Sequence, residues 1–235
     1  MRGKLQPRDR LIVGLDVGSV GEARALVDAI GDAAGFYKIG MQLVFAGGLP
    51  LIAELAARGK RIFLDMKLLD IDNTVAGGVA SIGGLGGVTF TTIHAYPKAM
   101  RAAVAAKPPG GPGLLAVTVL TSLDDADLRR AGYSTGAAEL VATRAADARD
   151  AGMDGVICSP HEIRRVRGIV GPDMAIVTPG IRPAGSSAGD QKRVTSPGEA
   201  ITAGADFIVV ARPVIEAPDP ARAAAAIVAE IEASA

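Results

Sequence analysis

The sequence predicts an α/β protein built as a single (β/α)8 TIM barrel over residues 1–235. Two observations predict this fold class. Short β-branched runs alternate with alanine-rich stretches of helical period, and strand starts recur at about 30 residues, the length of one βα unit. The chain length of 235 residues also suits this fold, which commonly takes about 250. No shift of composition and no long linker marks a domain boundary.

Eight strands are expected in order along the chain. Runs such as LIVGL and FIVVA are continuously apolar, which is typical of strands buried on both faces. Parallel strands need crossover connections, and eight βα units fit a closed barrel better than an open sheet. The expected strands are Leu11–Asp16, Gly35–Ile39, Arg61–Lys67, Val88–His94, Leu114–Leu120, Gly155–Cys158, Met174–Thr178 and Asp206–Val210.

Helical patterns occupy the segments between the strands. Thr74–Pro97 has no charged residue over a length that can span a bilayer, but it holds six glycines and changes period midway. We therefore expect a small-residue helix over 75–87, followed by a buried strand. The other expected helices include Val20–Ile30, Leu49–Arg58, Ala137–Ala151 and Pro220–Ala233, with an extra short helix over Leu123–Ala131.

Composition and charge argue against several classes of protein. Lysine plus arginine equal aspartate plus glutamate at 25 each, so no basic excess predicts binding to nucleic acid or to a membrane surface. The single cysteine, Cys158, cannot form an internal disulfide or a CxxC site. The apolar run Leu11–Leu15 is too short for the core of a signal peptide, and we expect a cytoplasmic protein.

Polar residues gather where the predicted strands end. In such barrels the working residues lie at the carboxyl ends of the strands and in the loops that follow. Asp65 and Lys67 are two residues apart on one strand, so both side chains are expected at the barrel mouth. A structural ion-pair network is the alternative, but Lys38 adds a charge that stability does not need. The full set is Asp16, Lys38, Asp65, Lys67, Asp70, His94, Thr121, Ser122, Arg182 and Arg212.

The segment after the seventh strand predicts a lid. Residues 179–193 are rich in Gly, Pro and Ser, and a loop of this length in a compact domain is usually functional. Arg182 and Gln191 would reach a ligand anion from it, the alternative being a plain surface loop. Arg212 ends the eighth strand, and loops after strands seven and eight of this fold usually bind phosphate. A phosphorylated ligand is therefore favoured.

Two further residues favour structural roles. His94 ends a buried strand and is expected to be a hydrogen-bonded neighbour of the site rather than a metal ligand. The other histidine, His161, opens a helix elsewhere, so the spacing of histidines and carboxylates predicts no metal site. Cys158 is expected to act as a small buried hydrophobic residue.

Several motifs follow one another in a distinctive order. The run FLDMKLLDIDNTV, residues 63–75, reads DxKxxDI followed by Thr, which is an uncommon string. LIVGLDV and FYKIGMQLV precede it, and TVLTS, VTPGIRP and DQKRV follow. In this order, and over nearly the whole chain, the motifs resemble those of the orotidine 5′-monophosphate decarboxylase family. The chain departs from common family residues at Leu69 and Asp72, beside the signature. It also departs at Ala211, where many members have Gly, and this change can lower phosphate affinity.

The resemblance implies loss of CO2 from orotidine 5′-phosphate to give uridine 5′-phosphate in pyrimidine biosynthesis, without metal or organic cofactor. Lys67 would be the proton donor, Asp65 would face the substrate carboxylate, and Asp70 would come from the other subunit of a homodimer with shared active sites. Lys38 would hold the carboxylates and the ribose. The implied substrate contacts are Asp16, Lys38, Ile71 and Thr74 on the loop before the glycine-rich helix, Thr121, Ser122, Pro179, Arg182, Gln191, Ala211 and Arg212.

Two other functions stay open. Related sugar-phosphate decarboxylases and aldolases share the DxK pattern but use magnesium, and an acidic ligand is expected on their second strand, where this chain has Lys38. The other alternative is a non-catalytic phosphate sensor on the same barrel, against which the intact Asp65, Lys67 and Asp70 argue.

Overall fold

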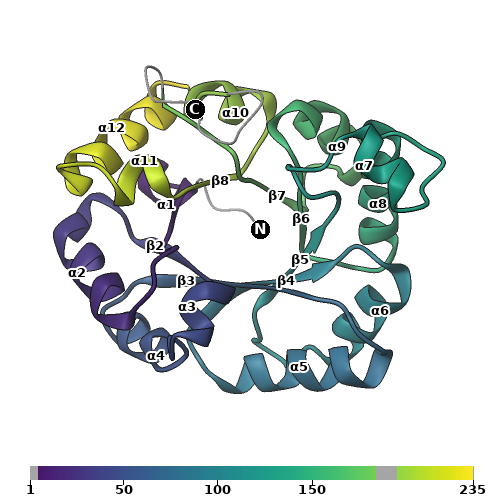
Figure 1. The fold of residues 1–235 in the computed structure, drawn as a ribbon, viewed down its shortest axis with the longest axis horizontal. Helices are drawn as coiled ribbons and strands as arrows, with labels where there is room; N and C mark the ends of the chain where they lie inside the picture. The colour runs from purple at the N-terminus through teal and green to yellow at the C-terminus, as the bar shows by residue number, and fades with distance from the viewer. Residues whose placement is uncertain (1–4, 184–194, 235) are drawn as a thin grey trace.

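Eight parallel strands close into a barrel in chain order, with the helices outside (Figure 1). The computed structural model describes residues 5–183 and 195–234. The ring closes where the first strand pairs with the last, with Leu11 opposite Ile208. This architecture confirms the predicted (β/α)8 barrel. The strands are β1 (Leu11–Gly14), β2 (Phe36–Gly40), β3 (Arg61–Leu68), β4 (Val88–His94), β5 (Gly113–Val117), β6 (Gly155–Ile157), β7 (Ala175–Thr178) and β8 (Phe207–Val210).

Helices form the outer layer, and several begin at a capping side chain. Asp124 caps its helix by accepting from the backbone N–H groups of Ala126 and Asp127, and the Asp127 carboxylate accepts from the N–H of Asp124 in return. The helices are α1 (Pro7–Arg10), α2 (Val20–Ile30), α3 (Met41–Phe45), α4 (Pro50–Ala57), α5 (Asp72–Gly84), α6 (Pro97–Ala106), α7 (Asp125–Arg130), α8 (Ala137–Asp150), α9 (Ile163–Val170), α10 (Pro197–Ala203), α11 (Arg212–Ile215) and α12 (Pro220–Ala233), with 3-10 turns η1 (Gly31–Ala33) and η2 (Pro160–Glu162).

The predicted elements agree with the observed ones apart from their ends. β1 stops at Gly14 and β5 at Val117, two and three residues earlier than expected, and a turn that closes from Leu123 to Leu120 follows β5. The uncharged segment divides into α5 and β4, as predicted. In the described part of the chain, no helix combines the length and the hydropathy needed to cross a membrane.

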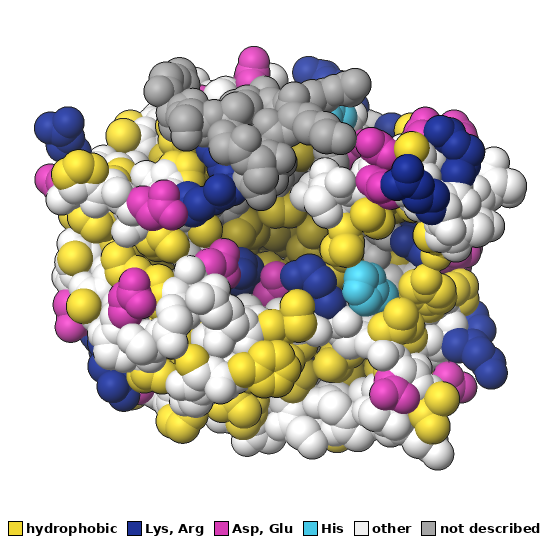
Figure 2. Space-filling model, in the orientation of Figure 1, with side chains coloured by type: hydrophobic (Ala, Val, Ile, Leu, Met, Phe, Trp, Pro, Cys, Tyr) yellow, Lys and Arg dark blue, Asp and Glu magenta, His cyan; other side chains and the backbone are white. Residues whose placement is uncertain are grey.

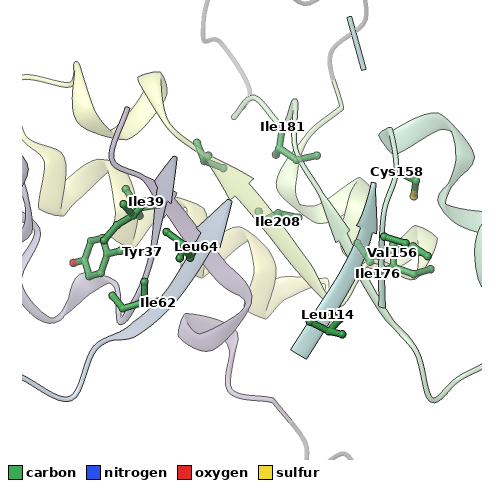
Figure 3. Packing of buried hydrophobic residues seen from close by; sticks show 14 of the residues in the cluster. Tyr37, Ile39, Ile62, Leu64, Leu114, Val156, Cys158, Ile176, Ile181 and Ile208 are labelled. Atoms are coloured by element: carbon green, nitrogen blue, oxygen red, sulfur yellow. The ribbon is translucent and has the colours of Figure 1, made fainter. Parts of the chain in front are cut away.

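The hydrophobic core lies on both sides of the strand ring. Outside it, strand residues such as Tyr37, Leu64 and Ile176 pack against the covering helices (Figure 3). Inside it, Phe36, Phe90 and Phe207 pack together, mostly edge to face, with ring centroids 5.3–5.9 Å apart. Phe36 and Phe207 begin their strands, so these rings fill the amino end of the barrel. The carboxyl end is thereby left for polar residues.

Candidate active site

Four charged side chains form a row of alternating sign at the carboxyl end of the barrel. Lys38 Nζ lies 2.6 Å from Asp16 Oδ1 and 4.0 Å from Asp65 Oδ2, and Lys67 Nζ lies 2.7 Å from the same Asp65 oxygen. The Lys38 and Asp65 side chains are each only 12% exposed. Charges this buried are stable when each has an opposite neighbour, as here. Figure 2 shows acidic and basic side chains side by side along a hollow with hydrophobic walls.

Two glycines make room for Lys38 inside the barrel. A β-carbon on Gly40 would lie 3.0 Å from Lys38 Nζ, and one on Gly14 would lie 3.3 Å from Lys38 Cε. The Gly14 position would also place that carbon 2.9 Å from Ala211 Cβ, which is too close for a real contact. A side chain at either position would therefore require the end of the Lys38 side chain to shift by a few tenths of an ångström.

The backbone at Lys67 departs from regular strand geometry. Its φ is +49°, in the left-handed region that residues other than glycine rarely adopt. The β3–β4 register also shifts between Leu64 and Leu68. The side chains of Asp65 and Lys67 meet, as predicted, although regular strand geometry is interrupted at Lys67. A bulge turns Lys67 toward Asp65, and strain of this kind is typical of functional sites.

Thr92 on β4 belongs to the same site, although sequence reasoning missed it. Its buried hydroxyl donates to Asp65 Oδ1 at 2.8 Å and accepts from the backbone N–H of Lys67 at 2.8 Å. In the sequence it is one of several threonines in a β-branched strand. The only signal was a polar residue two positions before His94, at the carboxyl end of β4.

Three members of the row, Lys38, Asp65 and Lys67, line a cavity of about 230 Å³. The segments after β5 and β7 contribute Thr121, Ser122 and Pro179 to the lining of the same cavity. The remaining walls are apolar. The lining residues are Lys38, Phe63, Asp65, Lys67, Val117, Val119, Leu120, Thr121, Ser122, Ile157, Pro179 and Val209. The cavity therefore combines charged and hydroxyl groups with apolar walls.

Asp70, Ile71 and Thr74 lie apart from this row. Asp70 Oδ1 accepts from the N–H of Ile71, and among the described residues it has no ion pair with Lys67. Asp70 and Ile71 line a wider, open hollow of about 620 Å³ together with Tyr96, and Ile71 is 72% exposed. Thr74 lies in the first turn of α5, and not on the preceding loop as expected.

The predicted phosphate residues lie around β7 and β8. Arg182 is nearly buried and donates from Nη1 to the Ile181 carbonyl at 2.9 Å, while its N–H donates to Thr195. Arg212 is exposed and begins α11, directly after Ala211. Gln191 lies outside the described residues. Of the described arginines, none forms part of the cavity wall.

His94 is close to the row but differs from the prediction. Burial, together with the positive charges of Arg144 and Lys67, holds the pKa of His94 below its usual value, so the ring is neutral at pH 7. Its ring forms no hydrogen bond with any described residue, which contradicts the expected hydrogen-bonded role. Cys158 is fully buried, as predicted, and burial raises the pKa of its thiol to about 12. Within the described ranges, no three or more His, Cys, Asp or Glu side chains are grouped to hold a metal ion.

Comparison with known proteins assigns the chain to a family. The sequence model of the orotidine 5′-phosphate decarboxylase / HUMPS family matches residues 9–227. The chain belongs to this family. The orotidine 5′-phosphate decarboxylase of Rhodopseudomonas palustris (strain BisB5) is 61% identical over 224 residues, 95% of each chain. That of Methylobacterium sp. (strain 4-46) is 58% identical over 234 residues, 98% of this chain and 99% of the relative.

Solved structures of the family share the fold. The crystal structure of orotidine 5′-phosphate decarboxylase from Lactobacillus acidophilus superposes with a TM-score of 0.82 at 38% identity, covering 94% of this chain and 98% of that one. Ala211, one of the positions at which the sequence is expected to depart from the family, has φ −112° and ψ −92°. Its φ is negative, so the backbone there does not require glycine for a left-handed conformation.

Proposed function

We propose that this protein decarboxylates orotidine 5′-phosphate to uridine 5′-phosphate and CO2. The observation that carries the proposal is the row Asp16–Lys38–Asp65–Lys67, in which the last three side chains line a cavity whose other walls are mostly apolar. Relatives about 60% identical over nearly the whole chain are named for this activity, which supports the proposal. A charged nucleotide substrate does not cross a membrane unaided, which favours a cytoplasmic location.

Asp65 and Lys67 would act on opposite sides of the reaction. The substrate carboxylate would face Asp65, and two like charges about 4 Å apart repel by roughly 4 kcal/mol at an effective dielectric of 20. Enzymes lower barriers by about 8–23 kcal/mol, so repulsion is only part of the effect. As the bond to the carboxylate breaks, its electron pair stays on carbon 6 and CO2 leaves. The cationic Lys67 stabilises that charge and then donates its proton to carbon 6.

Lys38 would hold the row together and supply positive charge without a metal ion. Its ammonium group lies between Asp16 and Asp65, so it fixes one carboxylate toward the ribose and the other toward the reacting group. In the magnesium-dependent alternative an acidic residue is expected at this position. We therefore propose a reaction that uses neither metal nor organic cofactor.

The base and the phosphate of the substrate would bind to the segments that follow β5, β7 and β8. Thr121 and Ser122 would contact the base, with Pro179 lining the same cavity. Arg182, Ala211 and Arg212, together with Gln191, would bind the phosphate, because arginines and backbone N–H groups after strands seven and eight usually do so in this fold. Binding energy from the phosphate, far from carbon 6, can then be used to close the site.

We also propose a homodimer in which each chain lends Asp70 to the other. The exposed apolar side chains of Leu69, Ile71 and Tyr96 around the open hollow favour burial against another chain. In a two-fold dimer the contact is mutual, so Ile71 and Thr74 would approach the partner's substrate with Asp70.

A mixing experiment tests the shared site. Lys67→Ala and Asp70→Ala homodimers should both be nearly inactive. Mixed dimers have one site with both changes and one with neither, so random reassembly should restore about a quarter of wild-type activity. Verified mixed dimers that stay as inactive as their parents would show that Asp70 serves its own chain.

The loss of absorbance of orotidine 5′-phosphate tests the function itself. We expect turnover by the purified chain, equal with and without a metal chelator. Turnover that the chelator abolishes would favour the magnesium-dependent chemistry. Binding of uridine 5′-phosphate without turnover of orotidine 5′-phosphate would favour the non-catalytic sensor.

A further inference from the structure

The pairing of β3 with β4 is interrupted at the site. Leu64 lies opposite Thr91 and Leu68 lies opposite Ile93, so three residues of β3, 65–67, face the single residue Thr92. A regular parallel ladder cannot satisfy the backbone groups of the longer segment. The Thr92 side chain replaces one missing backbone hydrogen bond, because its hydroxyl accepts from the N–H of Lys67 at 2.8 Å.

The same hydroxyl also fixes Asp65. It donates to Asp65 Oδ1 at 2.8 Å, while the other oxygen, Oδ2, contacts Lys67 Nζ at 2.7 Å and Lys38 Nζ at 4.0 Å. One hydroxyl thus hydrogen-bonds both the Asp65 carboxylate and the backbone N–H of Lys67, the residue with the left-handed conformation. Its donor and one acceptor position are both used, and Thr92 has no exposed surface.

We propose that Thr92 is a positioning residue that aligns Asp65 with Lys67 for decarboxylation. The proposal rests on the proposed function. Thr92 is not among the described residues that line the cavity, so it acts through its two neighbours and makes no contact with substrate. Displacing catalytic groups by about 1 Å can cost about 10²-fold in rate. The loss should therefore appear in kcat while KM for orotidine 5′-phosphate is little changed.

Thr91 provides a matched control in the same strand. It is equally buried, and its hydroxyl donates to the Leu64 carbonyl at 2.9 Å. Side chains alternate along a strand, so Thr91 is expected on the helix side, opposite to Phe90, whose ring packs inside the barrel. Thr91→Val and Thr92→Val each remove one buried hydroxyl and keep the shape of the side chain. Only Thr92→Val removes a bond to the charged row.

The test compares steady-state kinetics of the wild type, Thr92→Val, Thr92→Ser and Thr91→Val, each shown to be folded by circular dichroism. We expect kcat to fall at least tenfold in Thr92→Val with KM within threefold. Thr92→Ser, which keeps the hydroxyl, should recover to within threefold of the wild type, and Thr91→Val should stay within twofold. If Thr92→Val does not fold, Thr92→Ala compared with Thr92→Ser isolates the hydroxyl instead.

The outcomes separate this inference from the proposed function. An active wild type with kcat of Thr92→Val within threefold, or with an equal loss in Thr91→Val, overturns the positioning role alone. Failure of Thr92→Ser to recover activity overturns it as well, because the hydroxyl would then not be the group that matters. A wild type without turnover overturns the proposed function, and the positioning role falls with it.

Discussion

Replacing Lys67 by glycine should give a more stable protein than replacing it by alanine. Both variants lose the same ion pair with Asp65, so the comparison isolates the backbone. At φ +49°, a residue with a β-carbon is strained by roughly 1–2 kcal/mol, and glycine is not. Glycine loses more entropy on folding, by about 0.5–1 kcal/mol relative to alanine. The balance favours Lys67→Gly by about 0.5–1 kcal/mol, against the usual order within strands.

Urea unfolding of the two variants measures this difference. Met66, the preceding residue, has no positive φ, so Met66→Ala should be more stable than Met66→Gly in the usual order. The opposite orders at neighbouring positions would identify the left-handed backbone as the cause. If the free energy of unfolding of Lys67→Ala exceeds that of Lys67→Gly by as much as Met66→Ala exceeds Met66→Gly, the account of a bulge that turns the lysine is wrong.

Three further predictions concern groups around the row. Gly40→Ala should lower kcat/KM because Lys38 Nζ must shift by a few tenths of an ångström, while Gly35→Ala, with no atom within 4 Å of its new carbon, should leave kinetics unchanged; equal effects would refute this crowding. His94 binds protons less readily in the folded protein, so stability should fall as pH drops below about 6.5. The free energy of unfolding of the wild type in urea, relative to that of His94→Gln, should therefore decrease from pH 8 to pH 5. A difference that stays constant with pH would contradict the lowered pKa. Arg212→Ala should weaken calorimetric binding of uridine 5′-phosphate about 10- to 100-fold but leave uridine binding unchanged, since a hydrogen bond between charged groups contributes about 1.5–3 kcal/mol. Equal losses for nucleotide and nucleoside would indicate a structural role.

The fold was predictable because its signals are local. Each strand is a short apolar run, and helical segments follow the strands in turn, so the order of elements predicts a closed parallel barrel. Strand ends were less predictable, because β5 ends where a turn forms at Leu120 rather than where the apolar run ends.

The site was only partly predictable for a different reason. Charged residues at strand ends stand out from an apolar sequence, and Lys38, Asp65 and Lys67 were identified in this way. The bulge at Lys67 and the hydrogen bonds of Thr92 depend on how β3 pairs with β4, and a local sequence pattern does not predict this pairing. The lowered pKa of His94 likewise depends on burial and on the charge of Arg144, far away in the sequence.

The rate of uridine 5′-phosphate formation by Lys67→Ala, compared with the wild type, tests the central claim most directly. Lys67 is the ammonium group that contacts Asp65 at 2.7 Å, and its side chain is 29% exposed, so its removal should leave the fold intact. We expect the wild type to convert orotidine 5′-phosphate. The variant should be about 10²–10⁴-fold slower while still binding uridine 5′-phosphate. A folded variant that keeps more than about a tenth of wild-type turnover would contradict the assignment of Lys67 as the proton donor.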